Sequence, residues 1–247
     1  MIVREHTIVP QSEEQTISAH FPPVETAHGL LNMVLSLRNA GDMGPSADFS
    51  NERRTRFFDL HGIGPQRVIG LRQIHSKTVY YAENSSSFTG KEGDGLFTDN
   101  PRTVLGVTVA DCLPIFLVDS AAGRFGVVHS GWKGTGIVLT ALENMNRVSG
   151  SPIDVIIGPG IGNCCYSVDE QRADQFRRSF GPGSVVPGPP PRLDLRAANL
   201  TLLSGAGQVV RTVTVTSNCT ACTPFLGSFR REGPEHFTRM IALIGYF

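Results

Sequence analysis

The chain has 247 residues, with 22 lysines and arginines balanced by 22 aspartates and glutamates. This balance excludes the strongly basic surface that attracts nucleic acids or anionic membranes, and it favours a small ligand. No stretch approaches the roughly 20 apolar residues of a membrane span, and residues 1–15 lack a secretory apolar core. Five cysteines, an odd number, are typical of reduced thiols rather than of a disulfide framework. We therefore expect a cytoplasmic protein.

The first half of the chain predicts one helix followed by several strands and a second helix. Residues 1–40 show no clear periodicity and support no prediction. Residues 50–60 (SNERRTRFFDL) begin with a good capping residue and predict a short helix. Apolar and β-branched runs predict strands at residues 67–74, 77–82, 104–109, 113–118 and 124–129. The last two strands form a hairpin, and apolar residues near helical spacing predict a helix over residues 134–148.

The second half continues the mixed pattern. A buried strand at residues 153–157 runs into a Gly-Pro-Gly-Ile-Gly turn, and Ser167 with Glu170 resembles a capping box for a helix ending near residue 180. Further on, the sequence predicts a helix at residues 194–204 and strands at 209–216, 225–230 and 240–246. These last elements are too few to build a second core, so we expect residues 1–247 to form a single domain of mixed α and β class.

Three potential metal ligands occur at predicted strand ends. They are His75, Cys112 and His129. Zinc accepts imidazole nitrogen and thiolate sulfur together, and three protein ligands with an open fourth position are typical of a catalytic site. A histidine or cysteine at a strand end is, taken alone, more often a packed or hydrogen-bonded residue. The tight turns implied by Asp111 and Pro114, and by Gly131 and Gly134, nevertheless indicate backbone exposed at a pocket.

Several sequence blocks around these residues resemble the signature blocks of the YfiH-like laccase-domain family. They cover about residues 50–240. The blocks are QIH at 73–75, DG at 94–95 with Thr98, VADCLP at 109–114, HSGWKG at 129–134, IGP at 157–159, CCY at 164–166, DL at 194–195 with Asn199, NCT at 218–220 and SFRR at 228–231.

The resemblance implies a mixed α/β (α+β) fold with a layered α-β-β-α arrangement, mixed sheets and a duplicated β-rich unit. It also implies one metal, zinc or copper, bound by His75, Cys112 and His129. The implied activity is phosphorolysis of purine nucleosides such as adenosine, inosine and methylthioadenosine, with adenosine deamination beside it. Phosphate would then need a basic side chain, for which Arg54 is the candidate, with Arg53 as the alternative register and a solvated helix face as the alternative role.

Three other functions remain open. A multicopper laccase needs on the order of ten histidine ligands, whereas this chain has seven histidines, although a single copper in the same site would allow weak polyphenol oxidation. A cysteine hydrolase or deamidase, for example one that edits cell-wall precursors, would use Cys112 as nucleophile and His129 as base. A fourth protein ligand would instead make the zinc purely structural.

The remaining candidate residues have alternative roles. Cys219 and Cys222 form a C-x-x-C pair without a second pair of matching spacing, and the adjacent cysteines at 164–165 are interpreted as buried packing residues. Trp132 is either a core anchor or a platform for a base, with the core preferred. Asp111 either polarises a ligand histidine or caps its own turn.

Overall fold

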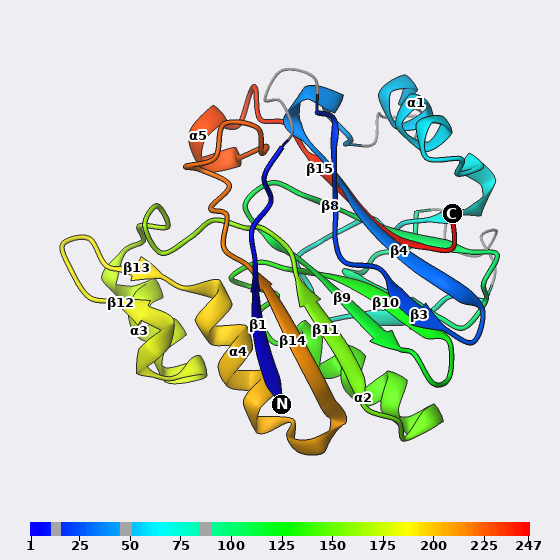
Figure 1. Cartoon of the computed structure of the whole chain (residues 1–247). Coiled ribbons are helices and arrows are strands. Elements are labelled where there is room, and N and C mark those ends of the chain that lie inside the picture. Colours follow the sequence, from blue (N-terminus) through cyan, green and yellow to red (C-terminus); the bar gives the residue numbers. More distant parts are fainter. Residues whose placement is uncertain (11–15, 45–50, 84–89) are drawn as a thin grey trace.

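Two mixed β-sheets form the centre of the molecule, with helices outside them (Figure 1). The computed structural model describes residues 1–10, 16–44, 51–83 and 90–247. The strands are β1 (Ile2–His6), β2 (Ser18–His20), β3 (Val24–Thr26), β4 (Gly29–Ser36), β5 (Val68–Ile69), β6 (Val79–Tyr81), β7 (Gly95–Thr98), β8 (Val104–Val109), β9 (Leu113–Asp119), β10 (Arg124–Ser130), β11 (Ile153–Ile157), β12 (Val185–Val186), β13 (Arg192–Leu193), β14 (Val210–Thr216) and β15 (Met240–Gly245). The α-helices are α1 (Glu52–Leu60), α2 (Ile137–Ser149), α3 (Glu170–Phe180), α4 (Leu195–Gly205) and α5 (Phe229–Glu232).

Both large sheets contain parallel and antiparallel neighbours. The seven-stranded sheet has the order β1-β14-β11-β9-β10-β7-β6, in which β14 is parallel to both of its neighbours and β9 is antiparallel to both of its own. The other sheet has the order β2-β4-β15-β8-β5, with β3 paired to β4 off this path. Strands β12 and β13 form a separate two-stranded sheet.

The alternation of side chains along the central strands separates three hydrophobic cores. In β9, Leu113, Ile115 and Leu117 pack with residues of α2, α3 and α4, whereas Phe116 and Val118 pack between the two sheets. Both faces of this strand are buried, which is why it is a continuous apolar run in the sequence.

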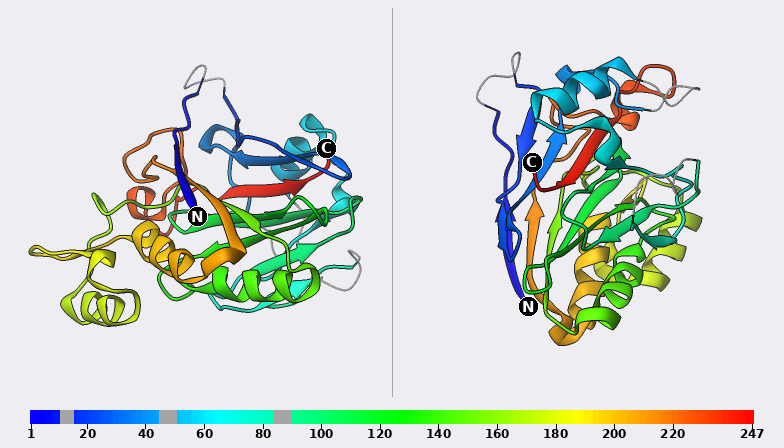
Figure 2. Two further views of the ribbon diagram at one scale, coloured as in Figure 1. Left: turned by 60° about the horizontal axis from the view of Figure 1, so that its bottom comes forward. Right: turned by 90° about the vertical axis from the view of Figure 1, so that its right-hand side faces the viewer.

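The third core lies under α1. From β15, Ile241 and Leu243 pack with Phe57 and Phe58 of that helix, while Met240 belongs to the core between the sheets. Figure 2 shows α2, α3 and α4 on one side of the sheets and α1 beyond the other. The predicted layered α-β-β-α arrangement with mixed sheets is therefore confirmed.

Most of the predicted elements are present, but the predicted cap at Ser167 and the predicted strands at residues 67–74 and 225–230 are wrong. Residues 1–40, for which no prediction was offered, hold β1 to β4. The predicted capping box at Ser167 is wrong, because the N-cap of α3 is Asp169, whose side chain accepts the backbone N–H of Arg172 at 2.8 Å. Ser167 instead forms a β-bridge with Arg192. Helix α1 is capped by Asn51, and Ser50, where its start was predicted, lies outside the described residues.

Of the predicted strand at residues 67–74, only the two residues of β5 are a strand. Further on, the side chain of Gln73, and not the backbone, forms the hydrogen bonds to the neighbouring strand β8. Its Oε1 accepts the backbone N–H of Thr108 at 2.7 Å, and its Nε2 donates to the Thr108 carbonyl at 2.8 Å. The predicted strand at 225–230 is also wrong, because Ser228 begins α5 by accepting the N–H of Arg231.

The chain passes from the six-stranded to the seven-stranded sheet twice, and each link carries a candidate ligand. His75 lies between β5 and β6, and Cys112 lies between β8 and β9. Strand β10 places His129 opposite Pro114 of β9. The three residues therefore meet where the two sheets part, although His75 belongs to a loop rather than to the strand end that was predicted.

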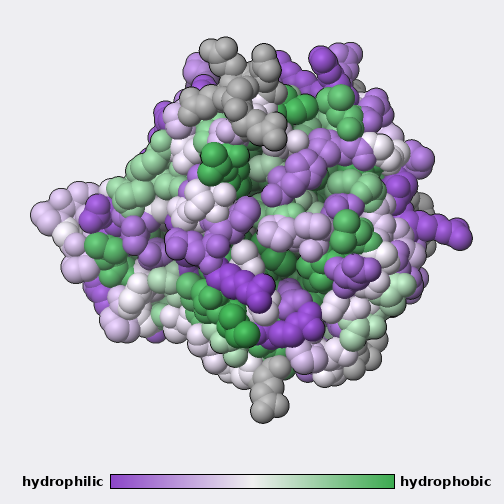
Figure 3. All heavy atoms as spheres, viewed as in Figure 1, coloured by the Kyte–Doolittle hydropathy of each residue, from purple (hydrophilic) through white to green (hydrophobic). Residues whose placement is uncertain are grey.

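The outer surface carries no strong segregation on the face shown in Figure 3, where hydrophobic and hydrophilic residues are interspersed. None of the helices in the described part of the chain combines the length and the apolar character that crossing a membrane would require.

Candidate metal centre and active site

The ligand atoms of His75, Cys112 and His129 all lie within 4.8 Å of one another. The two imidazole rings meet edge to face, with centroids 4.8 Å apart. His129 is buried, Cys112 is half-buried and His75 is exposed, so the group is open on one side. In the parts of the chain that the structure describes, no fourth histidine, cysteine or acidic side chain joins it. This donor set suits zinc with an open position.

Gly131 leaves the space that the sulfur needs. A Cβ at this position would lie 2.5 Å from Cys112 Sγ and 3.5 Å from Cδ2 of His75. Any side chain there would push the thiol away from the two imidazoles. The glycine is required for close approach rather than for an unusual backbone angle.

The carboxylate of Asp94, which is fully buried, holds both histidines. Its Oδ1 accepts hydrogen bonds from His129 Nδ1 at 2.9 Å and from the backbone N–H of His75 at 3.0 Å. Its Oδ2 accepts from the backbone N–H and the hydroxyl of Ser76 at 2.6 and 2.7 Å. Because Nδ1 of His129 is engaged, Nε2 is the nitrogen that remains for the metal.

These hydrogen bonds keep the carboxyl group of Asp94 ionised and stabilise the backbone conformation of His75. Burial alone would raise the pKa of Asp94, but the hydrogen bonds from His129 and Ser76 lower it to about 2. His75 has a φ of 59°, a left-handed conformation that is uncommon for a residue other than glycine. The hydrogen bonds from consecutive backbone N–H groups to Asp94 stabilise this turn.

The thiol of Cys112 and the ring of His129 perturb each other. Burial would raise the pKa of Cys112, but the charge of His129 and hydrogen bonds with both histidines lower it to about 7. Burial would lower the pKa of His129, but Cys112 and Asp94 raise it to about 9. A thiolate is therefore available at neutral pH, as a metal ligand and as a nucleophile.

Asp111 neither polarises a histidine nor caps only its own turn. Its Oδ1 accepts from the hydroxyls of Thr220 and Ser228 at 2.6 and 2.7 Å, and its Oδ2 accepts the backbone N–H of Arg230 at 2.6 Å. Asp111 therefore anchors the loop before α5 beside the metal centre. The histidine is oriented by Asp94, a role that the sequence did not reveal, although residues 94–95 form one of the blocks that resemble the family.

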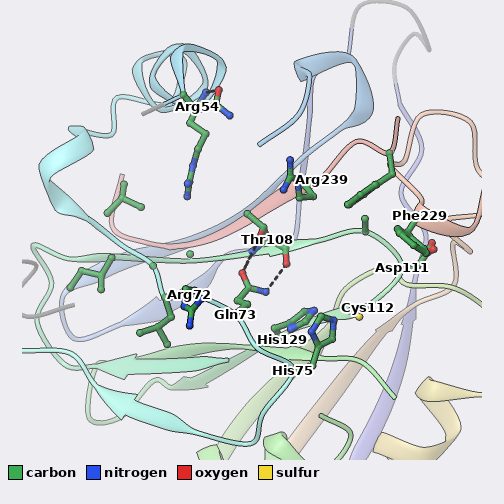
Figure 4. Close-up of a pocket in the computed structure, with 18 of the residues that line it drawn as sticks. Arg54, Arg72, Gln73, His75, Thr108, Asp111, Cys112, His129, Phe229 and Arg239 are labelled. Carbon is green, nitrogen blue, oxygen red and sulfur yellow. Dashed lines mark hydrogen bonds between the residues drawn. The ribbon is translucent and has the colours of Figure 1, made fainter. Parts of the chain in front are cut away.

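A cavity of about 1310 Å³ opens in front of the metal centre. Figure 4 shows Arg54 extending from α1 into this cavity, on the side opposite His75, Cys112 and His129. Arg53 is exposed and is not among the lining residues. Of the two candidate registers, only Arg54 places a guanidinium in the cavity.

Arg54 differs from Arg72 and Arg239, which also line the cavity, because it forms no ion pair among the described residues. Arg239 pairs with Asp42 at 2.5 Å, and Arg72 pairs with Glu92. Among the described residues Arg54 makes no ion pair, and its buried Nε has no hydrogen-bond partner. Burial lowers its pKa from the ordinary arginine value, yet it stays charged at neutral pH. A half-buried guanidinium that faces a cavity and forms no ion pair is suited to binding an anion.

Trp132 packs against the core, which is the preferred of the two roles considered for it. It is half-buried against the core under the seven-stranded sheet, and it also lines the cavity. The guanidinium of Arg172 lies 4.6 Å from the centre of its ring. That cation–π contact involves a ring face that a base would otherwise use.

Comparison with known proteins identifies the family. Residues 34–246 match the family model described as multi-copper polyphenol oxidoreductase laccase. The chain is 32% identical over 216 residues to the purine nucleoside phosphorylase YlmD of Geobacillus stearothermophilus, which covers 80% of this chain and 78% of the relative. The chain belongs to the YfiH-like laccase-domain family.

Relatives of this chain share its fold but are named for different reactions. The crystal structure of YlmD from the same organism superimposes with a TM-score of 0.76 at 29% identity, over 87% of this chain and 91% of YlmD. The adenosine deaminase RL5, from an unknown prokaryotic organism, is 37% identical over 152 residues, which are 57% of each protein. The relatives of this chain thus carry names of two different reactions on purine nucleosides.

The family's description names a multi-copper laccase, but this chain has too few potential copper ligands for several copper ions. Seven histidines are present in the chain, and within the described residues only His75 and His129 belong to a group of three or more potential ligands. Several copper ions would need many more imidazoles than this.

We expect Asp94→Asn to weaken zinc binding by roughly 10- to 100-fold, because the amide no longer fixes His129 and the turn of His75. Competition with a chelating dye measures this change. Asp154→Asn is the matched control, since Asp154 is also buried and hydrogen-bonded, to Arg211, but contacts none of the ligands. Equal zinc affinity in both variants would contradict the role of Asp94.

In metal-free protein we expect the alkylation rate of Cys112 to be half-maximal near pH 7, because its thiolate forms above its lowered pKa of about 7. An ordinary cysteine would give a midpoint near 8.5. Peptide-resolved mass spectrometry after iodoacetamide treatment measures each thiol. Cys164 is the internal control, because burial and neighbouring thiols raise its pKa to about 11. His129→Ala should raise the midpoint of Cys112, and an unshifted midpoint in that variant would contradict the coupling.

Proposed function

We propose that this protein is a zinc-dependent, cytoplasmic purine nucleoside phosphorylase that cleaves adenosine, inosine and methylthioadenosine, with adenosine deamination as a side activity. One observation carries the proposal: three potential metal ligands and a half-buried arginine, which forms no ion pair among the described residues, line the same cavity of about 1310 Å³. The names of YlmD and RL5 support the two reactions.

The cavity offers a separate place for each part of the reaction. Phosphorolysis requires a phosphate oxygen to attack C1′ of the nucleoside while the purine leaves, so both reactants must be held together. Arg54 presents a planar guanidinium that matches a phosphate through two hydrogen bonds. Desolvation of this group in the cavity strengthens its attraction for an anion. Tyr166 and Phe229 also line the cavity and provide apolar surface for the purine.

The metal centre lies across the cavity from Arg54 and suits the purine end of the substrate (Figure 4). His75, Cys112 and His129 would hold the zinc, and Asp94 would keep Nε2 of His129 free to bind it. A zinc ion in this position supplies Lewis acidity and lowers the pKa of a water ligand towards 7. This chemistry explains deamination directly, whereas phosphorolysis depends chiefly on positioning by the protein.

A second candidate function has its own support. Cys112 hydrogen-bonds to His129, and His129 in turn hydrogen-bonds to Asp94 at 2.9 Å. This is the order of groups found in a nucleophile, base and orienting acid, with the pKa of Cys112 already lowered to about 7. A cysteine hydrolase or deamidase would use the sulfur of Cys112 as nucleophile, and the same sulfur would bind the metal. One molecule therefore cannot use Cys112 in both ways at the same time.

The zinc-loaded protein should convert inosine to hypoxanthine and ribose 1-phosphate only when phosphate is present. Adenosine should give adenine in the same way, and inosine without phosphate. Chromatography separates the free bases, ribose 1-phosphate and inosine. No product under either condition would overturn the proposal. Activity that survives removal of zinc but is lost on alkylation of Cys112 would support the hydrolase instead.

Arg54→Ala should raise the KM for phosphate by roughly 10- to 100-fold, because a hydrogen-bonded charged pair contributes about 1.5–3 kcal/mol. The KM for the nucleoside should change much less. Steady-state kinetics at varied phosphate measure this split. Arg53→Ala is the matched control, since Arg53 precedes Arg54 in α1 but is exposed and does not line the cavity. Parallel losses in the two variants would remove Arg54 from the phosphate site.

A further inference from the structure

Four of the five cysteines form a second cluster, away from Cys112. Their Sγ atoms all lie within 4.8 Å of one another, and they belong to Cys164, Cys165, Cys219 and Cys222. The sulfur of Cys222 is 3.6 Å from that of Cys164 and 3.2 Å from that of Cys165. Cys164 is exposed and Cys165 only half-buried, so the interpretation of this pair as buried packing residues is wrong.

The backbone, and not chance contact of side chains, brings these residues together. Strands β11 and β14 are parallel neighbours, so the loops that leave their carboxyl ends meet at the same edge of the sheet. Gly160 of the first loop forms a parallel bridge with Cys219 of the second, and its carbonyl accepts the N–H of Thr220 at 3.1 Å. Cysteines separated by more than fifty residues in the sequence are thereby fixed side by side.

The spacing of the sulfurs fits a tetrahedral metal site better than a disulfide. Zinc binds thiolates at about 2.3 Å, which places the four sulfurs of a tetrahedron roughly 3.8 Å apart. Two of the sulfur distances, 3.6 and 3.2 Å, are slightly shorter than this value, and none of the distances among the four exceeds 4.8 Å. A disulfide would need a sulfur distance of about 2.05 Å, and all four cysteines are free thiols.

The surroundings of Cys219 favour a thiolate. The backbone N–H of Gly162 donates to Cys219 Sγ at 3.1 Å in a buried position. Gly162 also leaves room for the cluster, because a Cβ there would lie 3.2 Å from Cys164 Sγ. The guanidinium of Arg196, held by the carbonyls of Gly160 and Ser217 at 3.1 and 3.2 Å, adds a positive charge nearby. Such N–H groups and cations stabilise metal-bound sulfur.

We propose that Cys164, Cys165, Cys219 and Cys222 bind a second zinc ion in a closed tetrathiolate site. With four protein ligands no position remains for a substrate, so this zinc is structural. The assignment does not depend on the proposed nucleoside reaction.

The site would fix a wall of the active-site cavity. The first loop contacts the backbone of Asp111 through the N–H of Ile161 at 2.8 Å, and it continues to Tyr166, which lines the cavity. The second loop contacts the carboxylate of Asp111 through Thr220. Arg230 donates to the carbonyl of Cys165 at 3.1 Å. A metal joining the two loops therefore stabilises the surroundings of Asp111, next to the first metal centre.

Metal and thiol content test the proposal on the intact protein. Protein purified with reductant and zinc should contain about two zinc ions per chain, and Cys112→Ala should retain about one. In Cys112→Ala loaded with cobalt(II), we expect an intense thiolate-to-cobalt charge-transfer band, because the remaining site has only sulfur ligands. The four cluster thiols in this variant should react with a thiol reagent only after a chelator removes the metal. These measurements leave the cluster unaltered, so misfolding of a cluster variant cannot obscure them.

The reciprocal variant, Cys219→Ser with Cys222→Ser, should retain the zinc at His75 and lose the cobalt band of the tetrathiolate site. A Cys112→Ala protein without zinc, or with thiols that react before chelation, would overturn the proposal. Thiols released only by a reductant would show a disulfide and also overturn it. Iron in place of zinc in the purified protein would reject the assignment of the metal. Failure of the nucleoside assay would leave each of these results unchanged.

Discussion

The carboxylate of Asp94 receives hydrogen bonds from the ring of His129 and from the turn that carries His75. Because this carboxylate is buried and its pKa is lowered to about 2, it retains its charge at any pH at which the protein would work. The charge supports the left-handed backbone of His75, fixes the tautomer of His129 and raises the pKa of that ring. Through His129 it also acts on Cys112, so one residue outside the group of candidate ligands influences the charge of His129 and Cys112 and the backbone of His75.

A second buried aspartate does comparable work on the other side of the ligands. Asp111 adjoins Cys112 in the link between the sheets and binds Thr220, Ser228 and the backbone of Arg230. Its φ of 82° is, like that of His75, in the left-handed region. These two left-handed residues lie on links that cross between the sheets, where hydrogen bonds to carboxylates hold the chain. The proposed tetrathiolate zinc would strengthen the loops on which Asp111 acts.

The sequence predicted the central strands well because both of their faces are buried. The strands that contain Phe116 and Leu243 are continuous apolar runs, and few other structures accommodate such runs between polar turns. The prediction failed at Gln73, where a side chain replaces backbone hydrogen bonds, and at Ser228, where a cap interrupts an apolar stretch. The partner of Gln73 is distant in the sequence, so local propensity carried no information about it, whereas the cap of Ser228 is a local contact with the N–H of Arg231.

Residue types and their neighbouring blocks were sufficient to select His75, Cys112 and His129 as candidate ligands, because few side chains bind zinc and the family blocks surround all three. The sequence also determined the layered class of the fold through its buried strands. Only the tertiary structure decided that Arg54 rather than Arg53 enters the cavity, since that depends on which face of α1 packs on the sheet. It alone united the four remaining cysteines, because their meeting follows from the parallel pairing of β11 and β14, a contact between segments that no local pattern specifies.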